Sequence, residues 1–189
     1  MLLEIPYNRQ RAVAYAKKWA LSRNPLFVDF TGIGGNCTNF VSQCVFAGCG
    51  IMNYTPTFGW YYISADNRAP AWSGVDEFFG FITDAPDFAQ ANGGAGPYGR
   101  LIDDEPVYSV GDVIQLANSQ GEFYHTLIIS GFQGGDILVC AQTDDALDRP
   151  LSSYNYASLR IIHIEGARLE FNSELIYTNL LGAVSLPVR

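Results

Sequence analysis

The sequence predicts a single α+β domain over residues 1–189, in which helices come first and antiparallel strands follow. Two stretches of the first half, residues 8–22 and 37–46, carry apolar residues at helical spacing. The second half holds four short apolar runs typical of strands, and a glycine pair between two of them predicts a hairpin turn. A length of 189 residues fits one domain that buries a substantial core.

Composition and charge exclude several classes of protein. Apolar residues make up 48% of the chain and charged residues 16%, which excludes a disordered or fibrous chain. Nineteen acidic and eleven basic residues give a net charge of −8, and the basic residues are not clustered. We therefore expect neither nucleic acid nor an anionic membrane as a partner. No run approaches the ~18 apolar residues of a membrane helix, so we expect no membrane insertion.

The N-terminus lacks the basic start and the long apolar stretch of a signal peptide, so the protein is either cytoplasmic or has lost a leader. Four cysteines, Cys37, Cys44, Cys49 and Cys140, are too few for a disulfide scaffold. The chain has no Cys-x-x-Cys pair and only two histidines, so we expect no zinc or other metal site.

The first helix is expected to begin after Asn8, a good N-cap residue, and to end before Pro25. A glycine-rich loop over residues 29–36 leads into the second helix, which begins at Cys37 and is stopped by Gly48 and Gly50.

The middle of the chain, residues 54–100, is aromatic and rich in glycine, and we expect one short helix over 74–83 within long loops. Long loops in a compact domain often carry binding function. Trp60 and Trp72 are therefore candidates for the wall of a substrate groove, with burial in the core as the alternative.

Strands are expected at residues 112–116, 123–130, 137–142 and 159–164. The pair Gly134 and Gly135 predicts a two-residue turn between the second and third strands. Residues 175–184 could form an extra strand or a docking tail.

Cys37 is the candidate nucleophile, because a helix N-terminus favours the thiolate form of a cysteine. Its helix presents Cys37, Val41, Cys44 and Gly48 on one face, which we expect to lie against the sheet. The Cys37 backbone N–H is a candidate oxyanion donor, and the Asn36 side chain is a second one. The alternative is that Cys37 is a small core residue.

His125 is the candidate base, since it shares an apolar strand face with Leu127 and Ile129 that we expect to face the Cys37 helix. Counting back from the two-residue turn pairs Leu127 with Gln142 and His125 with Asp144. Either partner could orient the imidazole. An error of one residue in the turn would put both on the wrong face.

Several motifs resemble one known family. They are YNRQ at residues 7–10, GGNCTNFVSQC at 34–44, GDVI at 111–114, HTLII at 125–129, RPLSSY at 149–154 and RIIHI at 160–164. This set is similar to the bacterial putative amidase domain, which belongs with the papain-like cysteine hydrolases, akin to the CHAP and NlpC-type cell-wall peptidases. The resemblance covers about residues 7–165, which leaves 166–189 as a C-terminal tail.

The resemblance implies a papain-like fold with the nucleophile helix packed on an antiparallel sheet, and it requires no cofactor. It implies Cys37 as nucleophile, His125 as base and a third group near Gln142 or Asp144. The implied substrate is a peptide or a peptidoglycan stem peptide, with a secreted or cell-surface location; the oligomeric state stays open. Family members often have an acidic residue where this chain has Asn36.

The leading hypothesis is a cysteine hydrolase that cleaves amide bonds through an acyl-enzyme. The alternative is a catalytically weak module that holds a glycan or peptide with its aromatic loops, because a neutral Gln142 would stabilise an imidazolium poorly. A third hypothesis is a redox protein that uses Cys44 and Cys49.

Overall fold

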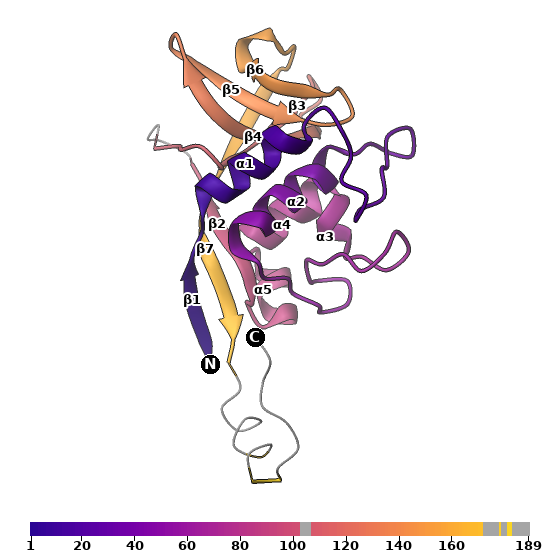
Figure 1. Ribbon diagram of the computed structural model, residues 1–189, viewed down its shortest axis with the longest axis vertical. Helices are drawn as coiled ribbons and strands as arrows, with labels where there is room; N and C mark the ends of the chain where they lie inside the picture. Colours follow the sequence, from indigo (N-terminus) through magenta and orange to yellow (C-terminus); the bar gives the residue numbers. More distant parts are fainter. Residues whose placement is uncertain (103–106, 172–177, 179–180, 183–189) are drawn as a thin grey trace.

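The protein folds as a curled antiparallel sheet with helices against one side, and Figure 1 shows this arrangement in the computed structural model. The structure describes residues 1–102, 107–171, 178 and 181–182. The predicted α+β class is confirmed. No helix in this described part is both long enough and apolar enough to span a membrane.

The described helices are α1 (Arg9–Trp19), α2 (Cys37–Cys49), α3 (Pro70–Ser73), α4 (Val75–Ile82), α5 (Pro86–Asn92) and the 3-10 turn η1 (Leu151–Ser153). The strands are β1 (Leu2–Pro6), β2 (Gly96–Leu101), β3 (Val113–Ala117), β4 (Phe123–Gln133), β5 (Asp136–Ala141), β6 (Ala146–Pro150) and β7 (Ser158–Glu170). Their order in the sheet is β1-β7-β3-β4-β5-β6, and β2 also pairs with β7.

Strand β7 links the two halves of the sheet. Its first part pairs with β3, while its second part is flanked by β1 and β2. Residues 166–170, expected in a C-terminal tail, therefore belong to the sheet and pair with β1. Most of residues 175–184, expected as an extra strand or docking tail, lie outside the described residues.

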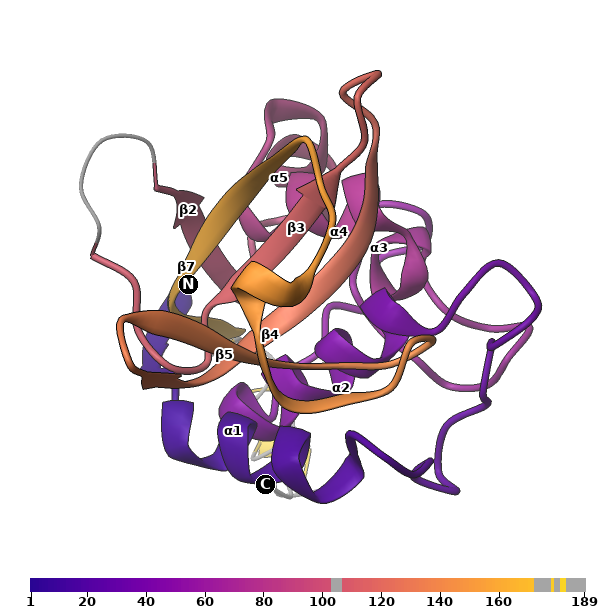
Figure 2. The ribbon, with the colours of Figure 1, turned by 90° about the horizontal axis from the view of Figure 1, so that it is seen from above.

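The two main helices form where the sequence predicts them. The Asn8 side chain accepts a hydrogen bond from the Arg11 backbone N–H at 3.0 Å and caps α1. Helix α2 continues through Gly48, which was expected to stop it. It is capped instead by Gly50, whose φ of 69° is the left-handed conformation that glycine adopts at little cost. Helix α2 packs on β4 and is buried over most of its length, as Figures 1 and 2 show.

Two apolar clusters lie on opposite faces of the sheet. The cluster between the helices and the sheet includes Val41 and Cys44 of α2, so the α2 face predicted to meet the sheet does so. The second cluster forms where the sheet curls over itself at the end with β5 (Figure 2). It consists of Ile114, Leu116, Leu127, Ile129, Val139, Ala141, Ala146 and Leu151.

The prediction that Leu127 and Ile129 face the Cys37 helix is wrong. They belong to the second cluster, and Ile128 between them belongs to the cluster on the helix side. The side chains of β4 do alternate between the two faces of the sheet. Because both faces are buried and apolar, the sequence does not tell which of them meets the helices.

Residues 50–69 form a long loop, as expected for this part of the chain, whereas α3, α5 and β2 take the place of the loops expected after it, and α4 matches the predicted short helix. Trp60 and Trp72 are fully buried, with ring centroids 4.7 Å apart. Their indole N–H groups donate to Ser42 and Asn39 of α2 at 3.1 and 2.8 Å. The prediction that these tryptophans line a groove is therefore wrong, because they fill the core beside α2.

The β4–β5 hairpin has the predicted turn but not the predicted register. Gln133 pairs with Asp136 across Gly134 and Gly135, whose φ angles are both positive. A bulge between Ile129 and Gly131 then shifts the pairing by one residue, so that Ile128 instead of Ile129 lies opposite Cys140. The expected pairings of Gln142 with Leu127 and of Asp144 with His125 do not form on this register.

Candidate active site

Cys37 occupies the first position of α2, after a loop that ends in Gly34 and Gly35. Its side chain is 7% exposed, and its sulfur lies 3.8 Å from the Thr38 hydroxyl. That hydroxyl in turn lies 2.8 Å from the hydroxyl of Thr126 on β4. This contact holds the start of α2 against the strand at the residue next to His125.

His125 is 9% exposed, and its Nε2 atom is buried without a hydrogen-bond partner among the described residues. Burial lowers the pKa of His125, the nearby Asp144 carboxylate opposes this effect, and the Arg149 guanidinium adds to it. The net lowering keeps the imidazole neutral at neutral pH, which is the form that accepts a proton.

Cys37 and His125 line the same pocket, which has a volume of about 410 Å³. Its walls come from the loop before α2, from β4, and from the chain between β5 and β7. The lining residues are Gly34, Gly35, Cys37, Tyr124, His125, Thr143, Asp144, Arg149, Tyr154 and Asn155. Of the predicted site residues, the structure brings Cys37, His125 and Asp144 together here.

Asn36 and Gln142 lie behind the pocket and bind each other. The Asn36 side-chain amide donates to Gln142 Oε1 at 2.5 Å, and its backbone N–H donates to the Thr143 hydroxyl at 2.6 Å. Gln142 Nε2 donates to the carbonyls of Trp19 and Ser22 at 2.7 and 2.8 Å. These contacts tie the loop before α2 to the end of α1. They leave Asn36 badly placed as an oxyanion donor and direct Gln142 away from His125.

Asp144 lies at the rim of the pocket. Its carboxylate accepts from Arg149 Nη1 at 2.7 Å and is largely exposed. It influences His125 through its charge, because no hydrogen bond joins the two side chains among the described contacts.

Sequence reasoning missed five other lining residues, Tyr124, Thr143, Arg149, Tyr154 and Asn155. The strand position of Tyr124 directly beside His125 offered one signal, and the motif at 149–154 offered the other.

The second histidine belongs to a different cluster. His163 Nδ1 lies 2.8 Å from the fully buried Asp112 carboxylate, and Arg9 Nη1 donates to the same carboxylate at 2.5 Å. The backbone N–H groups of Ser109 and Ile164 donate to it as well. These contacts tie the start of α1 to β7 and to the residue before β3, and none of the three side chains lines the Cys37 pocket.

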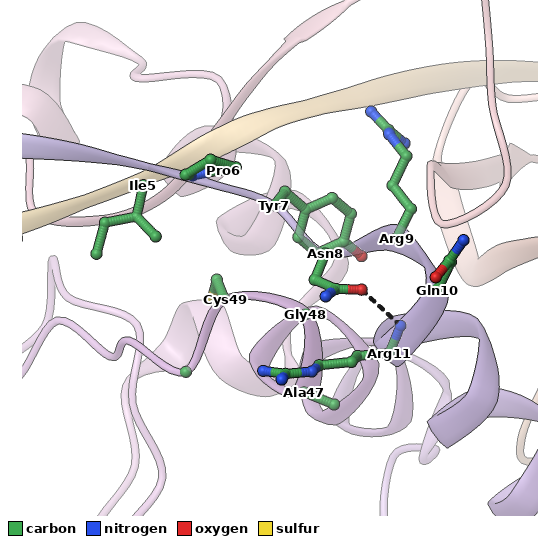
Figure 3. A pocket seen from close by; sticks show the side chains of 11 residues that line it. Ile5, Pro6, Tyr7, Asn8, Arg9, Gln10, Arg11, Ala47, Gly48 and Cys49 are labelled. Carbon is green, nitrogen blue, oxygen red and sulfur yellow. Dashed lines mark hydrogen bonds between the residues drawn. The ribbon is translucent and has the colours of Figure 1, made fainter.

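A second pocket of about 580 Å³ lies at the opposite end of α2, beside the start of α1 (Figure 3). Its thiol, Cys49, donates to the Ile51 carbonyl at 3.6 Å, and burial raises the pKa of Cys49 to about 11. Burial also raises the pKa of Cys44. Both thiols stay protonated at neutral pH, which argues against the redox hypothesis.

No group of three or more His, Cys, Asp or Glu side chains within the described ranges could hold a metal ion.

The model of the putative amidase domain family matches residues 6–164. The chain belongs to this family. The match includes both α2 and the strand of His125, and the family description points to hydrolysis of amides in general.

A relative of this amidase domain is the uncharacterized protein YhbB of Bacillus subtilis (strain 168), which is 32% identical over 144 residues. The match covers 74% of this chain and 42% of YhbB, so the chain spans about two fifths of that relative's length. No solved structure matches the chain.

Proposed function

We propose that this amidase domain is a cysteine hydrolase that cleaves an amide bond through an acyl-enzyme on Cys37. One observation carries the proposal: Cys37, at the N-terminus of α2, and His125, with its unpartnered Nε2, line the same pocket. A thiol at a helix N-terminus and a neutral imidazole are the nucleophile and base that this chemistry needs.

The reaction has two halves. His125 accepts the Cys37 proton while the sulfur attacks the amide carbon and the C=O π pair moves to the oxygen. When the carbonyl re-forms, the C–N bond breaks and the amine leaves with the proton from His125. Water then attacks the thioester, His125 accepts its proton, and the C–S bond breaks to release the acid and restore the thiol.

Charges around the pocket support these steps. The first N–H groups of an α-helix have no partner within the helix, which supports the Cys37 N–H as a donor to the oxyanion. The Asp144 carboxylate favours the imidazolium that forms in each half-reaction, since it raises the pKa of His125 against burial. Asp144, instead of Gln142, is therefore the third group of the proposed site.

We infer a peptide substrate, such as a peptidoglycan stem peptide. Gly34 and Gly35 line the pocket beside Cys37, and the absence of a side chain lets a substrate backbone approach closely. This arrangement of a helix-terminal cysteine and a strand histidine supports the placement among papain-like hydrolases that the sequence motifs imply.

The test combines labelling and turnover. Iodoacetamide at pH 6–7 should alkylate Cys37 of the wild type ahead of the other three thiols, as peptide mass mapping would report. Cys37→Ala should abolish release of new amino groups from purified peptidoglycan, while the matched variant Cys49→Ala in the other pocket keeps it.

The rival binding module would show a different pattern. It predicts peptidoglycan binding without hydrolysis, equal binding by Cys37→Ala, and no preferential alkylation. The burial of Trp60 and Trp72 removes the aromatic wall on which that hypothesis relied.

A further inference from the structure

Two side chains that line the Cys37 pocket carry a buried polar atom without a hydrogen-bond partner among the described residues. These atoms are His125 Nε2 and the Tyr154 hydroxyl, on rings whose centroids are 6.1 Å apart. The third such side-chain atom in the described part of the chain, Arg23 Nε, lies 3.1 Å from the Asp29 carboxylate and so is not isolated. Since buried polar groups nearly always have partners, a pair of orphans in one pocket points to a ligand that supplies them.

Tyr154 is held rigidly by its neighbours. It follows η1, and its ring packs against the second apolar cluster. The Arg149 guanidinium lies over this ring, 4.0 Å from the centroid, and is itself fixed by Asp144 at 2.7 Å and by the Ser153 hydroxyl at 3.0 Å. The guanidinium stacks on the ring and makes no well-aligned hydrogen bond to the hydroxyl.

The hydroxyl remains a donor at neutral pH. Burial raises the pKa of Tyr154 above its ordinary value, and this effect outweighs the lowering by the charge of Arg149 and by the contact of its side chain with the hydroxyl. A fixed, protonated hydroxyl is the kind of group that stabilises developing negative charge.

We propose that the Tyr154 hydroxyl is the second oxyanion donor of this site. It would donate a hydrogen bond to the substrate carbonyl oxygen as the Cys37 sulfur adds to the carbon and the π pair moves to that oxygen, with the Cys37 N–H as the other donor. The inference rests on the proposed function. It gives Tyr154 the role expected from sequence for Asn36, whose donors are occupied by Gln142 and Thr143.

The test compares two reagents on Tyr154→Phe, which keeps the ring under Arg149 and removes only the hydroxyl. Iodoacetamide alkylates Cys37 by displacement of iodide, so no oxyanion forms. An N-acetyl dipeptide aldehyde, chosen as the tightest of a panel for the wild type, takes up the Cys37 sulfur at its carbon. The thiol proton ends on its oxygen, which occupies the oxyanion position.

Tyr154→Phe should bind the aldehyde about 10- to 100-fold more weakly and leave the rate and pH dependence of alkylation unchanged. Its kcat on an amide substrate should fall about 100-fold with KM nearly constant. The matched variant Tyr156→Phe makes the same change on the same segment outside the pocket and should leave both reactions as in the wild type.

Several results would overturn the inference. One is unchanged aldehyde binding by Tyr154→Phe, and another is the absence of any aldehyde that binds the wild type although Cys37 alkylates preferentially. A shifted pH profile of alkylation would also overturn it, because Tyr154 would then act through His125. Failure of the proposed function is distinguishable, because Cys37 of the wild type would then alkylate no faster than the other thiols.

Discussion

The two histidines of this chain stand in opposite kinds of polar cluster. His163 shares the buried Asp112 carboxylate with Arg9 and two backbone N–H groups, so its cluster is closed. His125 lines a pocket shared with Cys37, and its buried Nε2 has no hydrogen-bond partner in the part of the chain that the structure describes. Both lie in β-strands with isoleucine or leucine nearby, and their local sequences, HTLII at 125–129 and RIIHI at 160–164, do not distinguish their roles.

This difference indicates that the His163 cluster stabilises the fold, whereas the His125 pocket can bind a ligand. In a satisfied network the hydrogen-bonding groups already have partners within the protein. Removing one of these partners leaves a buried charge uncompensated, which destabilises the fold. An unsatisfied pocket weakens the fold locally but keeps hydrogen-bonding capacity for a ligand. We therefore expect substitutions in the His163 cluster to act on stability and substitutions in the His125 pocket to act on reactivity.

The largest expected effect is on catalysis. His125→Ala should lower kcat/KM for amide hydrolysis by about 10²- to 10⁴-fold, because it removes the general base. His163→Ala should leave the alkylation rate of folded Cys37 as in the wild type and lower the melting temperature instead. Equal losses of activity in the two variants, both measured well below their melting temperatures, would contradict the comparison.

Asp112→Ala should reduce the free energy of unfolding by about 3–5 kcal/mol, because Arg9 and His163 lose a shared buried acceptor. Urea unfolding at pH 7 measures the change. The control Asp144→Ala removes a carboxylate from an exposed ion pair and should change stability by no more than about 1 kcal/mol. A larger loss for Asp144→Ala than for Asp112→Ala would reverse the assignment.

Gln142→Ala tests a residue that the sequence placed in the active site but whose contacts in the structure are structural. It should cost about 1–3 kcal/mol of stability, because the Asn36 amide and the carbonyls of Trp19 and Ser22 lose their partner. The pH dependence of Cys37 alkylation should not move. A moved profile would return Gln142 to the role of imidazole orienter.

The smallest expected effect is a pH shift. Burial lowers the pKa of His125 below 6.5, so the neutral base persists as pH falls to that value and is protonated only below it. The acid limb of kcat/KM should therefore lie below pH 6.5. Asp144→Asn removes the charge that raises this pKa, and it should move the limb to still lower pH. A limb above pH 6.5, or a shift upward in the variant, would contradict this electrostatic account.

Much of the local structure followed from the sequence. The Asn8 cap, the helix that begins at Cys37 and ends at Gly50, and the Gly134–Gly135 turn all form as expected. These features depend on neighbours along the chain: side-chain caps, helical periodicity and the backbone freedom of glycine.

Tertiary structure decided the rest of the site. One bulged residue in β4 shifts the register of the hairpin, and no local sequence pattern predicts this bulge. As a result, Gln142 bonds to Asn36 instead of His125. Because both faces of β4 are buried, apolar character could not say which one meets α2.

The aromatic residues show the same division. Sequence alone identified an aromatic middle segment, but only packing shows that Trp60 and Trp72 fill the core while Tyr154 lines the pocket. The sequence by itself determined the reactive residue types and the elements that carry them. Which of those residues meet depended on strand register and on the curl of the sheet, because both are set by contacts between segments far apart in the chain.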